Sequence, residues 1–300
     1  MWRLGFFFHE MAFGLLSIFL PLYVVSIGGS LLDVGLMASV ATLLAIPASF
    51  FWGYICDKTG RYKRYILISF FASSALLCFF TFTRDIGLFI ILYVAMAVFH
   101  VAHEPPKNVL IAELYTREKW ERSFAFYEGF TEVGWLIGLV MGVFVSFLDF
   151  NSTTILLMCS GLNFLAFALS LFLVSDPLLI FERGLVHIEK SIDFACRGVT
   201  IASKVLDGLP ISESLTKENL ASFCSGLVFF AFATSTLFTP LPIFLSQNLG
   251  LATSMVYAVY ILNSGAGAVG YFLASKSLEL HEEKMHLQKV VILRSTLAFS

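Results

Sequence analysis

The chain has 300 residues, of which 58% are hydrophobic and only 13% charged, and its formal net charge at pH 7 is −2. Soluble domains carry about 25% charged residues, so a soluble fold of this composition would expose large apolar patches. The high apolar content excludes a disordered chain, and the near-neutral charge gives no nucleic-acid footprint. The composition therefore indicates a membrane protein with several spans.

Eight apolar runs are long enough to cross a bilayer as α-helices, which takes about 20 residues each. A ninth run begins near Val290 and is cut off at Ser300. The predicted spans are residues 4–27, 31–55, 65–83, 86–112, 123–148, 153–175, 220–246 and 251–275. We therefore expect an all-α protein with eight complete transmembrane helices and the start of a ninth.

Lysine and arginine residues predict the orientation of these spans. Of the 19 such residues, only Arg84 falls in a loop on the side opposite to the N-terminus. Positive charge collects in cytoplasmic loops. The pattern predicts a multi-pass protein of the cell (inner, cytoplasmic) membrane with a cytoplasmic N-terminus.

One long cytoplasmic segment interrupts the series of short loops. Apolar residues recur in it at spacings of three and four from Phe181 to Leu206, with charged residues on the other face. This predicts an amphipathic helix at the membrane interface, with a partner-binding helix as the alternative. The predicted domains are a six-helix transmembrane bundle at residues 1–175, a linker at 176–219 and a partial C-terminal bundle at 220–300.

The second bundle repeats features of the first. Leu20-Pro21-Leu22 in the first span matches Leu241-Pro242-Ile243 in the seventh, and Gly53-Tyr54 in the second matches Gly270-Tyr271 in the eighth. Both matched pairs of spans run in the same direction. Parallel repeats of this kind are one of the known transporter architectures.

The loop after the second span carries glycine, aspartate and basic residues at a fixed spacing. It reads G-x-x-x-D-K-x-G-R-x-K-R, with Gly53, Asp57, Lys58, Gly60, Arg61, Lys63 and Arg64 in the defined places. This loop resembles the signature of the major facilitator superfamily, G-x-x-x-D-[RK]-x-G-[RK]-[RK]. The resemblance implies two bundles of six helices in the full-length protein, a monomer, and a chain truncated within its ninth helix.

The residue types in this loop each have a physical use. Gly53 permits close approach of another helix, Asp57 can accept hydrogen bonds from a helix N-terminus, and Gly60 suits a turn with positive φ. The resemblance implies that the cluster latches the two halves on the cytoplasmic side and gates opening, with Glu113 as an ion-pair partner. The second copy, after Gly270, lacks the aspartate and the Gly-Arg pair.

The fifth span carries a row of small residues. Gly134, Gly138 and Gly142 follow one another at a spacing of four residues, which predicts a seam for tight helix packing. The row resembles the family's antiporter motif, G-x-x-x-G-P-x-x-G, except that Leu139 replaces the proline.

Ionisable residues inside the membrane are costly and point to function. Three spans carry them: His9 and Glu10 on the first, His100, His103, Glu104 and Lys107 on the fourth, and Glu128 and Glu132 on the fifth. The carboxylates of Glu10, Glu104 and Glu128 lie roughly 9–15 Å from the cytoplasmic helix ends, which predicts one acid-rich layer. Pro105 and Pro106 should interrupt the fourth helix beside it. The second half offers neutral candidates: Thr234, Ser235, Thr236, Thr239, Tyr257, Tyr260, Asn263 and Ser264.

This layer has three interpretations. Proton coupling or contact with a cationic substrate is favoured, since crowded carboxylates and three histidines can take up protons. A structural network in which Lys107 neutralises Glu104 or Glu128 is the second. A metal site is the third, but His100, His103 and Glu104 lack further ligands in sequence, so we predict no metal and no cofactor.

We therefore expect no enzyme but a secondary active transporter of a small organic solute, working by alternating access in the lipid bilayer. The favoured mode of transport is proton-coupled export by antiport, and proton-coupled uptake by symport is the alternative. An intramembrane metalloenzyme built on His100, His103 and Glu104, or a non-transporting membrane receptor, represents the other classes. The predicted partners are the solute, protons and lipid.

Overall fold

A computed structural model of the chain describes residues 2–114, 120–176, 229, 232–234 and 236–277. The regular elements in this part of the chain are helical throughout. All of those discussed below belong to one compact unit, which comprises residues 1–175 and 239–300. The elements are α1 (Leu4–Ser26), α2 (Leu31–Thr59), α3 (Tyr62–Phe80), α4 (Ile86–His100), the 3-10 turn η1 (Val101–His103), α5 (Glu104–Leu114), α6 (Trp120–Phe147), α7 (Ser152–Leu173), α10 (Leu241–Ile243), the π turn η3 (Phe244–Asn248) and α11 (Thr253–Ser277).

Seven helical segments in the described part are long and apolar enough to cross a membrane, with α4, η1 and α5 counted together as one span. They coincide with seven of the eight predicted runs to within a few residues, so the prediction of a multi-pass, all-α membrane protein is confirmed. The predicted run at 220–246 lies partly outside the described residues, which cover 229, 232–234 and 236–246 of it. The amphipathic helix at 176–219 and the ninth run lie outside them as well.

Side-chain caps fix where several helices begin. Ser30 and Asp33 form a capping box at the start of α2, with the Ser30 N–H donating to Asp33 Oδ2 over 2.7 Å. Asp85 and Asn151 accept backbone N–H bonds of 2.7 Å at the starts of α4 and α7. Such caps satisfy N–H groups that have no partner within the helix. They explain the short loops on this side of the bundle.

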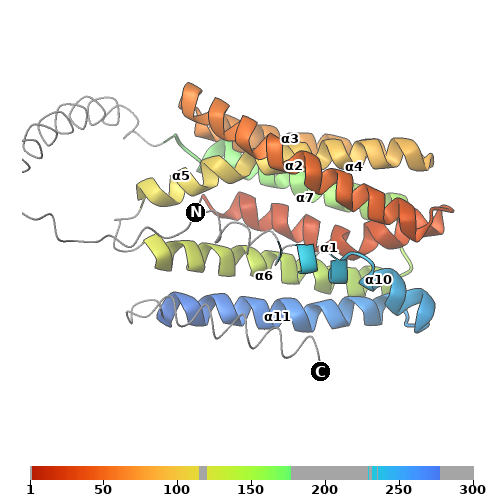
Figure 1. The fold of residues 1–300 in the computed structure, drawn as a ribbon. Helices are drawn as coiled ribbons and strands as arrows, with labels where there is room; N and C mark the ends of the chain where they lie inside the picture. Colours follow the sequence, from red (N-terminus) through yellow and green to blue (C-terminus); the bar gives the residue numbers. More distant parts are fainter. Residues whose placement is uncertain (1, 115–119, 177–228, 230–231, 235, 278–300) are drawn as a thin grey trace, which may run out of the picture. The chain divides into compact units, whose positions relative to one another are not determined.

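Helix α1 occupies the centre of the packing. It contacts α6, α7, α10 and α2, while α3 packs on α7 and α4, and α6 packs on α11. Figure 1 shows α6 running between α1 and α11. Two helices of the first bundle, α1 and α6, therefore carry much of the contact with α10 and α11 from the second.

Glycines allow the close crossing of α1 and α6. A Cβ atom at Gly134 would lie 2.6 Å from the Phe7 carbonyl oxygen, and one at Gly138 would overlap the Met11 carbonyl oxygen and lie 3.0 Å from Leu15 N. Gly142 instead faces the ring of Tyr257 on α11. The three glycines of the row thus meet two different helices, α1 and α11.

Candidate functional site

The interruption of the fourth span shapes the centre of the site. Pro105 and Pro106 have no N–H to continue the helical bonds, and the 3-10 turn η1 directly precedes them. The carbonyl of His100 accepts a bond of 3.1 Å from Ser69 Oγ, and the carbonyl of Val98 accepts one of 2.9 Å from the indole N–H of Trp52. Side chains from α3 and α2 therefore satisfy carbonyls around the break.

Lys107 joins α5 to α6 through two carboxylates. Its Nζ lies 2.6 Å from Glu104 Oε2 and 3.3 Å from Glu128 Oε1, and 5.4 Å from the centre of the Tyr127 ring. The lysine is only 7% exposed. The sequence predicted one of these pairs or the other, and the single ammonium group contacts both.

Two further carboxylates complete the layer. Glu10 on α1 interacts electrostatically with Glu104, Lys107, Glu128 and Glu132, but forms no hydrogen bond or ion pair with the described residues. Glu132 on α6 accepts a short hydrogen bond from Ser264 on α11. The layer thus holds four carboxylates around one lysine, and it reaches from α1 to α11.

The three histidines form a cluster that adjoins this layer, since His103 Nε2 lies 3.2 Å from Glu104 Oε1. His9 Nε2 lies 3.0 Å from His100 Nδ1, and each pair of rings among His9, His100 and His103 has its centroids 4.9 Å apart. His9 Nδ1 is 2.6 Å from Asn163 Oδ1 on α7, and His103 Nδ1 is 3.2 Å from Ser69 Oγ on α3. Sequence reasoning missed Asn163 and Ser69, although a lone asparagine in an apolar span is a usable signal.

The signature loop makes contacts of its own. Gly60 caps the end of α2 with a φ of 62°, which is the positive φ expected of it. Its N–H donates to Cys56 O over 2.9 Å. Lys63 Nζ donates to Leu171 O, near the end of α7, over 2.7 Å. Asp57 is exposed and accepts no hydrogen bond from the described residues. At Gly53 a Cβ would meet only Pro105 Cγ, at 3.8 Å.

The other residues of the predicted gate lie near the ends of α2, α3 and α5. Glu113 lies near the end of α5, while Arg61 precedes α3 and Arg64 lies in its first turn. Lys58 Nζ sits 5.7 Å from the centre of the Tyr54 ring. The segments 115–119 and 278–300 lie outside the described residues, and the latch between the two halves stays a prediction.

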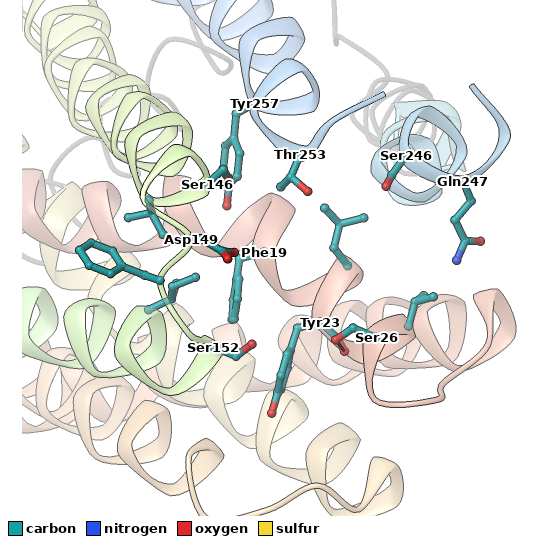
Figure 2. Close-up of a pocket in the computed structure, with 15 residues that line it drawn as sticks. Phe19, Tyr23, Ser26, Ser146, Asp149, Ser152, Ser246, Gln247, Thr253 and Tyr257 are labelled. Atoms are coloured by element: carbon teal, nitrogen blue, oxygen red, sulfur yellow. Dashed lines mark hydrogen bonds between the residues drawn. The ribbon is translucent and has the colours of Figure 1, made fainter. Parts of the chain in front are cut away.

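A pocket of about 430 Å³ opens at the opposite end of the bundle from the signature loop. Its polar groups include the carboxylate of Asp149, and Phe19 and Tyr23 line it with aromatic rings (Figure 2). It is lined by Phe19, Leu22, Tyr23, Val25, Ser26, Val145, Ser146, Asp149, Phe150, Ser152, Ile155, Ser246, Gln247, Thr253 and Tyr257. Of these, sequence reasoning had named only Tyr257 as a candidate contact for the solute, because most of the others lie near helix ends or in loops.

Comparison with known proteins now decides the family. The sequence matches the family model described as Major Facilitator Superfamily over residues 4–287. The chain belongs to the major facilitator superfamily. The resemblance carried by the loop from Gly53 to Arg64 is thereby confirmed.

Curated relatives match a smaller part of the chain. It is 30% identical over 178 residues to the multidrug resistance protein MdtG of Klebsiella pneumoniae, covering 58% of the chain and 42% of that protein. It is 28% identical over 181 residues to MdtG of a Rahnella species, with the same coverage. It is 26% identical over 142 residues to the uncharacterized MFS-type transporter YqjV of Bacillus subtilis, covering 47% of the chain and 34% of that protein. The chain thus spans less than half the length of these relatives.

Proposed function

We propose that the protein is a secondary active transporter that exports a small organic solute in exchange for protons. Membership of the major facilitator superfamily supports transport over an enzymatic role. The name of its MdtG relatives, multidrug resistance protein, supports organic compounds as the solute class and export as the direction. Alternating access between two bundles, in the inner membrane with a cytoplasmic N-terminus, is the mechanism we propose.

The carboxylate layer is the observation that carries proton coupling. Lys107 already contacts Glu104 and Glu128, and Glu132 is bonded to Ser264. Glu10 has no such contact among the described residues, and it interacts electrostatically with three carboxylates but only one lysine. Uptake of a proton removes the negative charge of Glu10 and its repulsion with the neighbouring carboxylates. We therefore assign the coupling role to Glu10, and supporting roles to the other three carboxylates.

The layer is connected to elements that must move. Glu132 on α6 bonds Ser264 on α11, so it links a helix of the first bundle to one of the second. Helix α1 carries Glu10 and also Phe19, which lines the pocket about 14 Å further along the helix. A change of charge at Glu10 therefore acts on a helix that also lines the pocket.

The pocket supports the solute class. Its volume of about 430 Å³ falls in the usual range for small organic ligands, about 300–1,000 Å³. Aromatic rings from Phe19 and Tyr23 suit a planar apolar body, and Asp149 suits a positive charge. We propose an amphipathic organic cation as the solute. The loop from Gly53 to Arg64 is the proposed gate at the other end.

Glu10→Gln should uncouple transport while leaving the fold intact. The amide has the size of the carboxylic acid but does not bind or release a proton, so the pH gradient loses its point of action. In proteoliposomes with the ethidium cation as the probe, we expect gradient-driven accumulation to fall at least tenfold, while ethidium exchange without a gradient persists. Fluorescence of trapped ethidium measures both.

Asp85→Asn is the matched control, because it also removes a carboxylate but keeps an N-cap at α4. We expect it to behave as the unmodified protein. Accumulation that continues after nigericin collapses the pH gradient would refute proton coupling. Gradient-driven accumulation by the Glu10→Gln protein would instead refute the role of this residue.

A further inference from the structure

Three histidines from two distant parts of the sequence meet inside the bundle. His9 comes from α1, His100 ends α4 and His103 ends η1, and one ring nitrogen of each lies within 4.8 Å of those of the others. His9 and His103 are buried. The carboxylate of Glu104 adds an oxygen 3.2 Å from His103 Nε2. The sequence argued against a metal site because His100, His103 and Glu104 lacked a further ligand, and His9 supplies one.

Hydrogen bonds orient two of the rings towards the centre of this cluster. The Asn163 amide nitrogen donates to Cys159 O over 2.9 Å, so its oxygen faces His9 and accepts from Nδ1–H. This leaves the lone pair of His9 on Nε2, on the side of the other histidines. Ser69 donates to His100 O, so its oxygen is left to accept from His103 Nδ1–H. His103 Nε2 then also points inward.

We propose that His9, His100 and His103 bind a divalent transition-metal ion, with Zn²⁺ as the ion that best fits the donor set and with Glu104, which lies beside His103 but outside the group of three, as the fourth ligand. Three imidazole nitrogens and one carboxylate are ligands that Zn²⁺ takes in tetrahedral sites. Tetrahedral ligand atoms lie about 3.3 Å apart at Zn–N distances of about 2.0–2.1 Å. The distances of 3.0 Å between His9 and His100 and 3.2 Å between His103 and Glu104 are close to that value.

Asn163 and Ser69 would orient the metal-binding histidines without binding the ion themselves. Histidines that bind a metal usually donate their other ring N–H to a fixed acceptor, which sets the ring orientation. Here α7 supplies the acceptor for His9 and α3 supplies the one for His103. A bound ion would tie α1 to the α4–α5 junction, directly at the helix break. The metal site requires neither the proposed solute nor proton coupling, so a failure of the proposed function would leave this proposal unaffected.

Metal titration of the tag-free protein in detergent tests this proposal. After dialysis against a chelator, we expect one Zn²⁺ to bind per chain, and Co²⁺ to give the intense visible bands of a four-coordinate site. His103→Ala should weaken Zn²⁺ binding at least a hundredfold and abolish the Co²⁺ bands. His187→Ala removes a histidine that is not one of the three proposed ligands and should leave both unchanged.

A second variant distinguishes loss of metal binding from misfolding. His100→Gln changes the one ring of the three that is only half-buried, and it should also lose the Co²⁺ bands while eluting as a single species in size-exclusion chromatography. Absence of stoichiometric binding to the folded protein overturns the proposal. Binding that survives in both variants overturns it equally, because the ion would then sit elsewhere. Zn²⁺ flux that requires the histidines would mark the ion as cargo, and binding without flux would mark it as resident.

Discussion

Lys107→Met should lower the free energy of unfolding by about 2–3 kcal/mol. The substitution keeps most of the apolar stem but leaves Glu104 and Glu128 without the ammonium group that contacts both. Removing one partner of a fully buried pair typically costs about 3–5 kcal/mol. We expect less here because the side chains of Glu104 and Glu128 are 38% and 40% exposed. Titration with SDS in mixed micelles, followed by circular dichroism, measures the change.

A second substitution separates charge from packing in this experiment. Adding Glu128→Gln to Lys107→Met removes one of the two uncompensated charges and should recover part of the lost stability. Lys107→Arg keeps the charge and should stay close to the unmodified protein. A double variant less stable than Lys107→Met alone would show that the effect is not electrostatic.

Gly138→Ala should lower the free energy of unfolding by about 2 kcal/mol. Its new Cβ would overlap the backbone oxygen of Met11, and backbone atoms cannot turn aside as a flexible side chain can. Overpacking costs up to about 3 kcal/mol, and the better helix propensity of alanine returns about 1 kcal/mol. The same SDS titration reports the difference.

Gly161→Ala provides the matched comparison. It adds the same methyl group to a helix, α7, but at a position where nothing lies within 4 Å of the new Cβ. We expect this protein to be as stable as the unmodified one or up to about 1 kcal/mol more stable. Equal losses in the two alanine variants would contradict the role of the α1–α6 crossing.

Much of the fold follows from local patterns. The apolar run from Leu4 and the run from Ser152 both became single helices with nearly the predicted ends. Crossing a bilayer requires only enough consecutive apolar residues, which is a property of the sequence window itself. Gly60 also follows from local chemistry, since the turn after α2 requires a positive φ that glycine adopts freely.

The sequence predicted the candidate site only in part. The sequence placed His100, His103, Glu104 and Lys107 together on the fourth span, but the break at η1 divides them among α4, η1 and α5. Two of them join the histidine cluster, and Lys107 turns towards α6. Proline chemistry predicted the interruption, yet the direction of each side chain after it depends on how α5 packs.

The sequence by itself therefore determined the membrane spans, the helix ends and the family, because hydrophobic length, turn chemistry and a spaced motif are encoded within short windows. The tertiary structure decided which polar groups meet. His9 and Asn163 are 154 positions apart in the sequence, and Glu132 and Ser264 are 132 positions apart. The rotation of each helix about its own axis sets such contacts, and that rotation follows from close packing at crossings such as Gly138 on Met11.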